Sequence, residues 1–198
     1  YTLSLHDALP ILLGDLRDSE ILLRELFDNC RDELAASKAC NTVYVWTGDF
    51  NILADNGRGI SVALSDDKTK TQMELACASI YAGGKFHSDK VQGGMHGIGM
   101  SAVNAVSDKF KIACKITEAN WEHSNELVQE AVKNFFDEFP GESLGGKMWL
   151  LLSYEKGIKI EEKVVNKELL DAEFNRELPE GLSTIVGFTP DLSIVGSS

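Results

Sequence analysis

A glycine-rich run at residues 82–107 is the part of the chain best suited to binding an anion. Its centre reads GGMHGIGMSAVNA, and the small residues allow positive φ, so successive backbone N–H groups can converge on one anion. Residues 100–106 are predicted to form a helix whose N-terminus faces the same point. Most glycine-rich loops bind nothing, and neither standard phosphate-loop pattern is present, so the run needs support from other segments.

A second segment, SEILLRELFDNCRDELAAS at residues 19–37, has the periodicity of an amphipathic helix. The predicted apolar stripe consists of Leu23, Leu26, Phe27, Cys30 and Leu34. Polar residues Glu25, Asn29 and Glu33 recur at every fourth position on the other side. This row is typical of a solvated face, but a carboxylate one turn from an amide can also place a general base beside a cation ligand.

A third candidate is Asp55, at the end of a predicted hairpin. Residues 41–46 alternate like a half-buried strand, residues 48–49 form a turn, and residues 51–54 begin a second strand. The second strand runs directly into DNGRG. A DNG tripeptide is usually only a turn, but here we expect Asp55 to project from the edge of the sheet, where ligands are often bound.

The remaining elements complete one layered domain. Residues 109–116, 147–155 and 158–165 are predicted strands, residues 164–176 a short helix, and residues 184–188 a final central strand. We therefore predict an α/β sandwich of the α+β type, with a mixed, mostly antiparallel sheet covered on one face by helices.

An acidic segment at residues 119–146 has its own amphipathic pattern. The apolar residues Leu127, Ala131, Phe135 and Phe139 recur at every fourth position. We expect this helix to pack on the sheet through that row, and a partner-binding role is the alternative.

Composition limits the possible functions. The net charge of −12 argues against direct binding of nucleic acid by this chain. Its four cysteines are widely spaced, which favours reduced thiols in a cytoplasm over disulfides or a zinc site. No apolar run approaches the roughly 20 residues that span a membrane, so no membrane partner is expected.

The first eleven residues, YTLSLHDALPI, back-translate into a sequencing adapter, and we expect them to be an artefact. A genuine N-terminal strand followed by a proline turn is the alternative. The predicted domain is therefore residues 12–198.

Four sequence blocks resemble the GHKL ATPase superfamily in their order and spacing. They are ELFDNCRDE (25–33), DNGRGIS (55–61), AGGKF…GGMHGIGMSAVNAVS (82–107) and GLSTIVGFTPD (181–191). The first two blocks also suit mismatch-repair ATPases, heat-shock chaperones and histidine kinases. The third is more particular to the ATPase domains of bacterial-type type II topoisomerases, the group of gyrase B and topoisomerase IV subunits.

The resemblance implies a role for each matching residue. Glu25 would be the general base, Asn29 would coordinate Mg²⁺, and Asp55 would accept a hydrogen bond from the adenine amino group. Gly59 and Thr184 would contact the base, and Glu33 and Arg58 would pair to support the first helix. The residues expected to wrap the β- and γ-phosphates are Lys85, Gly93, Gly94, Met95, His96, Gly97, Ile98 and Gly99.

The resemblance also implies the function, which is that of a domain that binds ATP and Mg²⁺. It would couple nucleotide binding, homodimerisation and hydrolysis to DNA strand passage. The enzyme would be cytoplasmic, in a bacterium or a phage-infected cell. Its partners would be DNA, bound by other domains, and an A-type cleavage subunit or fused equivalent. We expect a fragment with little or no turnover alone, because transducer and cleavage domains are not recognisable. The alternatives are another GHKL ATPase, such as a mismatch-repair protein, and a nucleotide-binding regulator without hydrolysis.

Overall fold

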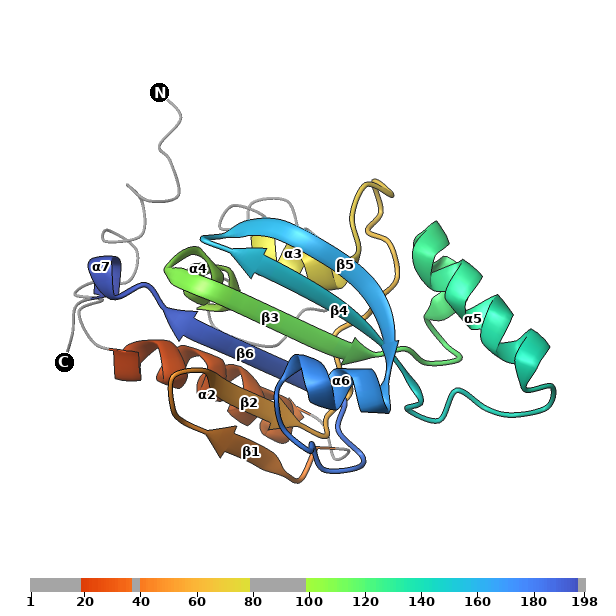
Figure 1. The fold of residues 1–198 in the computed structure, drawn as a ribbon, viewed down its shortest axis with the longest axis horizontal. Helices are drawn as coiled ribbons and strands as arrows, with labels where there is room; N and C mark the ends of the chain where they lie inside the picture. Colours follow the sequence, from red (N-terminus) through yellow and green to blue (C-terminus); the bar gives the residue numbers. More distant parts are fainter. Residues whose placement is uncertain (1–18, 37–39, 79–98, 196–198) are drawn as a thin grey trace.

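The computed structural model describes residues 19–36, 40–78 and 99–195, and its centre is a six-stranded sheet (Figure 1). The strands are β1 (Val43–Trp46), β2 (Asn51–Asp55), β3 (Ser107–Lys115), β4 (Met148–Glu155), β5 (Ile158–Asn166) and β6 (Thr184–Pro190). Their order across the sheet is β1-β2-β6-β3-β4-β5. All pairings between these described strands are antiparallel, and β6 is central, as predicted.

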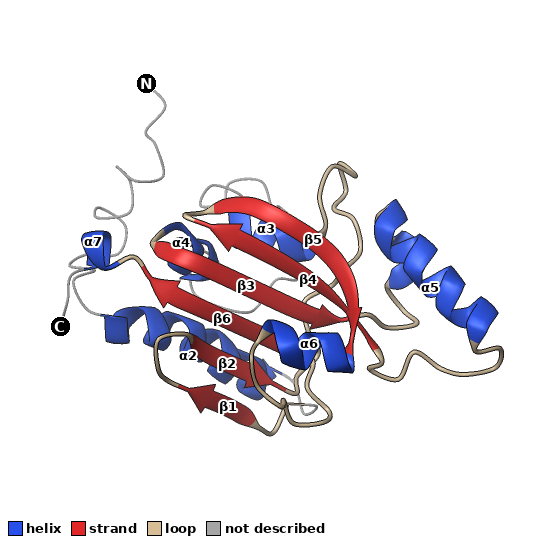
Figure 2. Cartoon of the chain, in the orientation of Figure 1, coloured by secondary structure: helices blue, strands red, loops and turns tan. Residues whose placement is uncertain are grey.

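Helices cover both faces of this sheet to different extents (Figure 2). The described helices are α2 (Ser19–Ala36), α3 (Gln72–Ala78), α4 (Gly99–Ala105), α5 (Glu126–Glu138), α6 (Lys167–Glu173) and α7 (Leu192–Val195), with a 3-10 turn η2 (Trp121–His123) before α5. None of these described helices is long and apolar enough to cross a membrane.

Successive side chains of each strand point to opposite faces of the sheet, so the core consists of two layers. On β2, Leu53 packs in the layer that contains α2, α3 and α4, whereas its neighbour Ile52 packs in the opposite layer. Residues Leu170 and Phe174, from α6 and its C-terminal end, belong to the second layer. The predicted helical cover is thus present on one face, and α6 adds a smaller cover on the other.

Helix α2 packs on the sheet through a row of side chains that shares Leu26 and Cys30 with the predicted stripe, and Leu23 of that stripe is partly buried against the same core. Leu22, Leu26 and Cys30 are buried at successive i, i+4 positions. Phe27 and Leu34 are 45% and 39% exposed, so the prediction that they face the core is wrong. Because the sequence reads ILL at the start of the helix, several neighbouring stripes are equally apolar, and packing against the sheet selects the one that contains Leu22.

Helix α5 lies beyond the β5 side of the sheet and also uses an unexpected face (Figure 1). Val128 and Val132 are fully buried, whereas Leu127 and Phe139 are each 42% exposed. The N-cap is Asn125, whose side chain accepts a hydrogen bond from the Val128 backbone N–H at 3.1 Å. The helix therefore packs against the core as expected. Its fully buried contacts come from the two valines, and of the predicted row Phe135 packs against the core while Leu127 and Phe139 do not.

The turn between β4 and β5 was predicted correctly. Lys156 and Gly157 both have positive φ, 49° and 77°, which suits a two-residue hairpin connection. The predicted helix at 164–176 is shorter than expected: Val164 and Val165 belong to β5, and α6 begins at Lys167.

Candidate functional site

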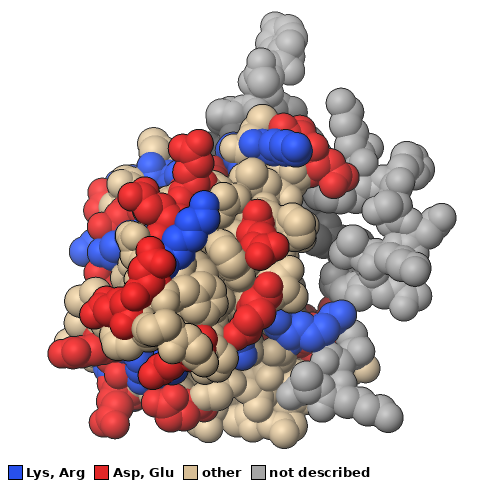
Figure 3. Space-filling view, turned by 90° about the vertical axis from the view of Figure 1, so that its right-hand side faces the viewer, with Lys and Arg blue, Asp and Glu red and all other residues tan. Residues whose placement is uncertain are grey.

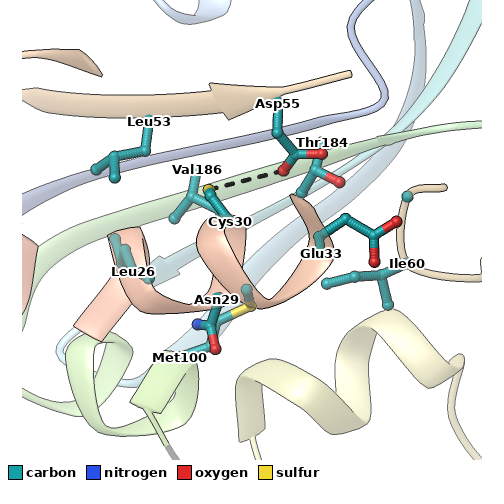
Figure 4. Close-up of a pocket in the computed structure, with 11 residues that line it drawn as sticks. Leu26, Asn29, Cys30, Glu33, Leu53, Asp55, Ile60, Met100, Thr184 and Val186 are labelled. Carbon is teal, nitrogen blue, oxygen red and sulfur yellow. Dashed lines mark hydrogen bonds between the residues drawn. The ribbon is translucent and has the colours of Figure 1, made fainter. Parts of the chain in front are cut away.

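A cavity of about 120 Å³ lies between α2 and the strands β2 and β6 (Figure 4). Five residues singled out from the sequence line it: Asn29, Glu33, Asp55, Gly59 and Thr184. The other lining residues are Leu26, Cys30, Leu53, Ile60, Met100 and Val186. Chemically, the cavity is an apolar slot with a few polar groups at its margins, which is the usual composition of a small-molecule site.

Asp55 is the buried carboxylate of this cavity. It ends β2, is only 6% exposed, and pairs across the sheet with Thr184 of β6. Its Oδ1 accepts a hydrogen bond from the Gly57 backbone N–H at 2.8 Å, and its Oδ2 lies 3.8 Å from the donor Sγ of Cys30. Burial raises the pKa of the Asp55 carboxyl above its ordinary value of 3.8. The side chain therefore offers a fixed acceptor beside a hydroxyl group, which suits a ligand that presents an amino group.

The thiol of Cys30 shares this buried environment. Burial, together with the neighbouring Asp55 charge, raises the pKa of the thiol to about 12. The sulfur therefore carries its proton at neutral pH and acts as a weak donor rather than as a nucleophile.

Two glycines allow the loop after Asp55 to approach the site closely. A Cβ added at Gly57 would lie 2.4 Å from Cγ of Glu33 and 2.9 Å from Oδ1 of Asp55. Gly59 has a φ of +77°, which residues other than glycine seldom adopt. The DNGRG sequence therefore does more than reverse the chain: it brings backbone against both carboxylates.

Glu33 and Arg58 join helix α2 to this loop. Arg58 donates from Nε to Oε1 at 2.9 Å and from Nη2 to Oε2 at 2.8 Å. Hydrogen bonding to Arg58 lowers the pKa of the Glu33 carboxyl below its ordinary value of 4.5. The Arg58 side chain is 61% exposed, so solvent screens the attraction between the two charges, and the hydrogen bonds hold the loop in place.

Glu25 and Asn29 lie one turn apart on α2, close to the start of α4. Both side chains are half-buried, and Asn29 reaches the cavity. A Cβ added at Gly99, the first residue of α4, would lie 2.8 Å from Oε2 of Glu25. The carboxylate therefore stands next to the end of the glycine-rich run, outside the residues that line the cavity.

Most of the predicted phosphate-binding run lies outside the described residues. This holds for Lys85, Gly93, Gly94, Met95, His96, Gly97 and Ile98. Only Gly99 is described, and it is adjacent to Glu25. The roles assigned to the other seven residues remain predictions.

The predicted stripe of α2 contains two of the lining residues, Leu26 and Cys30, but the sequence reasoning missed the apolar lining that the strands supply. Leu53 and Val186 are direct partners in the β2–β6 ladder, although they lie far apart in the sequence. Leu53 is two residues from Asp55 on β2, and Val186 is two residues from Thr184 on β6. Side chains two residues apart on a strand point to the same face of the sheet, so this spacing could have identified both as lining residues.

The chain resembles known proteins over part of their length. It is 35% identical to the DNA gyrase B subunit of Haloferax volcanii over 145 residues, which is 70% of this chain and 22% of the relative. It is 34% identical to the DNA topoisomerase IV B subunit of Mycoplasma pneumoniae over 124 residues, which is 59% of this chain and 20% of the relative. The chain thus spans about a fifth of the length of these relatives, and no family model matches it.

The fold matches that of a solved structure, the 43K ATPase domain of Thermus thermophilus gyrase B in complex with an aminocoumarin. The TM-score is 0.61 at 21% sequence identity, and the match covers 96% of this chain and 38% of the other. The sheet and its helices therefore form the GHKL ATPase fold. Within that class, the sequence comparisons identify the chain as a relative of the DNA gyrase B and topoisomerase IV B subunits.

Proposed function

We propose that this chain binds ATP with Mg²⁺ and serves as the ATP-hydrolysing domain of a type II DNA topoisomerase. The observation that carries the proposal is the buried carboxylate of Asp55, held beside Thr184 in a cavity whose other margin carries Asn29. The relatedness to gyrase B and topoisomerase IV B subunits supports it.

The cavity would hold the adenine base. Its apolar walls, including Leu53, Ile60 and Val186, would pack against the ring. Asp55 would accept a hydrogen bond from the exocyclic amino group, and Thr184 and Gly59, which also line the cavity, would contact the base. Guanine carries a carbonyl oxygen at the corresponding position, so it would face the carboxylate with an acceptor and bind more weakly.

The triphosphate would extend from the cavity toward Gly99. Asn29 lines the cavity together with Met100 of α4, and its amide oxygen is the kind of hard donor that Mg²⁺ accepts together with phosphate oxygens and water. When bound, Mg²⁺ would neutralise charge on the phosphates. Lys85 and the backbone of residues 93–99 would supply the remaining contacts to the β- and γ-phosphates.

Glu25 would act as the general base. Its carboxylate stands next to Gly99, one turn of α2 from Asn29, so a water molecule near the γ-phosphate would be within its reach. Glu25 would orient this water and take its proton as the oxygen attacks phosphorus. Glu33 and Arg58 would hold the loop that presents Asp55.

The complete protein would couple these steps to DNA. Two nucleotide-bound domains would dimerise around a DNA segment, with cleavage performed by an A-type subunit or a fused equivalent, in the cytoplasm. DNA would be bound by other domains, because this chain is acidic: Asp and Glu side chains are spread over the face shown in Figure 3. Residues 12–198 would constitute the nucleotide-binding domain, and residues 1–11 would be a sequencing-adapter artefact outside it.

The test is nucleotide binding by the purified chain. We expect calorimetric titration with Mg²⁺ to show that ATP binds more tightly than GTP. The Asp55→Ala variant should bind ATP about 10- to 100-fold more weakly, since it removes a hydrogen bond to a charged group, and should lose most of the preference over GTP. Asp66→Ala, which removes an exposed carboxylate, is the matched control and should behave like the wild type. Equal binding of ATP by wild type and Asp55→Ala would contradict the assignment.

A further inference from the structure

We propose that Cys30 is a positioning residue, whose thiol hydrogen-bonds to Asp55 and fixes the carboxylate oxygen that receives the adenine amino group. This inference rests on the proposed function. Cys30 has no role in the proposed function as stated above, and its contact with Asp55 would contribute to the specificity for adenine.

The contact joins two buried groups from different elements. The Sγ of Cys30, on α2, lies 3.8 Å from Oδ2 of Asp55 at the end of β2, and Figure 4 shows the two side chains directed toward each other. Cys30 is 7% exposed and Asp55 is 6% exposed. An ionised carboxylate can only accept hydrogen bonds, so the thiol is the donor.

The thiol completes the fixation of the carboxylate. The Gly57 backbone N–H holds Oδ1 at 2.8 Å, and the thiol holds Oδ2. Since the two donors come from the loop after β2 and from α2, rotation of the carboxylate would break one contact or both. Each carboxylate oxygen can accept more than one hydrogen bond, so Oδ2 remains available to a ligand in the cavity.

Helix packing keeps the thiol in place. Cys30 continues the buried row formed by Leu22 and Leu26, so its side chain has a defined direction. It also lines the cavity itself, next to Asn29 in the sequence. Helix α2 therefore has two roles in the site. It fixes the position of Oδ2 of Asp55 through Cys30, and it carries Asn29, the proposed Mg²⁺ ligand.

The experiment compares two nucleotides that differ at the relevant group. ATP carries the exocyclic amino group, and purine riboside 5′-triphosphate lacks it. Their dissociation constants are measured with Mg²⁺ for the wild-type chain, Cys30→Ala, Cys30→Ser and Asp55→Ala, and for Cys30→Ala combined with Asp55→Ala. Cys77→Ala is the matched control, because Cys77 is a buried thiol of α3 that does not line the cavity. Circular dichroism verifies folding of each variant.

We expect Cys30→Ala to weaken ATP binding about threefold while leaving purine riboside triphosphate unchanged. Cys30→Ser keeps a donor and should bind ATP within about twofold of the wild type. In the Asp55→Ala background, Cys30→Ala should add nothing further, and Cys77→Ala should leave the ratio of the two dissociation constants unchanged.

Equal weakening of both nucleotides by Cys30→Ala would overturn the inference and leave ATP binding intact. The inference would also be overturned if Cys30→Ser lost the preference for ATP over purine riboside triphosphate. This second result can be obtained even if Cys30→Ala does not fold. Failure of the wild-type chain to bind either nucleotide would instead remove the proposed function, and the inference with it.

Discussion

Glu33 and Arg58 are joined by side-chain hydrogen bonds from Nε and Nη2 of Arg58, and the Arg58 backbone N–H also donates to Oε1 of the same carboxylate at 2.8 Å. One acidic side chain of α2 thus binds both the side chain and the main chain of the loop that follows Asp55. Since the loop also supplies the Gly57 N–H to Asp55, the pair stabilises the cavity from its rim.

This pair predicts a pH dependence of stability. The pKa of Glu33 is lowered in the folded state, so its stabilising contribution is present above the ordinary value of 4.5 and is lost as the pH falls through the lowered value. The Glu33→Gln variant lacks the negative charge of the carboxylate at every pH. We expect the free energy of unfolding of the wild type to exceed that of Glu33→Gln at pH 7, with the difference shrinking below about pH 4.5. Urea unfolding at several pH values measures it, and a difference independent of pH would contradict the role of the charge.

Glu25→Ala should separate hydrolysis from binding. The carboxylate lies outside the residues that line the cavity, so we expect ATP affinity to change by less than about threefold, whereas loss of a general base lowers turnover by about 100-fold or more. Turnover is measured as phosphate release in the complete subunit that we propose, and binding by calorimetry. Arg24→Ala, at the exposed preceding position, is the control. Full turnover in Glu25→Ala would assign the base elsewhere.

Gly57→Ala should disturb both carboxylates of the rim. Its Cβ would lie 2.4 Å from Cγ of Glu33, a contact that forces displacement of α2 or of the loop. We expect a loss of about 1 to 3 kcal/mol in the free energy of unfolding and weaker ATP binding. Gly48→Ala is the matched control, because a Cβ there meets nothing within 4 Å, and it should change stability by less than about 0.5 kcal/mol. Thermal and urea unfolding of the two variants distinguish these outcomes.

Helix α5 provides a test of which face is buried. Val132→Ala should cost about 1 to 3 kcal/mol of unfolding free energy, because Val132 is fully buried, whereas Leu127→Ala should cost less than about 0.5 kcal/mol. Urea unfolding compares the two. The reverse order would restore the face predicted from the sequence spacing.

The strands were predictable because the pattern of apolar and polar residues in each strand matches the burial of those residues in the sheet. Residues 41–46 alternate, the Lys156-Gly157 pair marks a turn, and a run of apolar residues identifies the central β6. Helix α3 was missed because seven residues are too few to show a convincing helical period. The buried face of α2 was assigned only in part, with Phe27 and Leu34 wrongly included, because contact with the sheet, rather than the pattern alone, decides among adjacent apolar stripes.

The polar residues of the site were predictable, and their surroundings were not. Asn29, Asp55 and Thr184 stand in short motifs whose chemistry is visible in the sequence, and all three line the cavity. The contact between Cys30 and Asp55 depends on how α2 lies across the sheet, which no local pattern encodes. Sequence reasoning therefore found the groups that could bind a nucleotide but not the thiol beside them.

The position of β6 has a consequence for how the chain acquires its structure. β2 and β3 each pair with β6 on one side, yet β6 is the final strand described along the chain. During synthesis, β2 and β3 each keep an unpaired edge until β6 has been made. Such nonlocal pairing slows folding and exposes strand edges to association with other chains. The order of the strands thus makes the nascent chain most vulnerable to aggregation shortly before the cavity between α2, β2 and β6 can form.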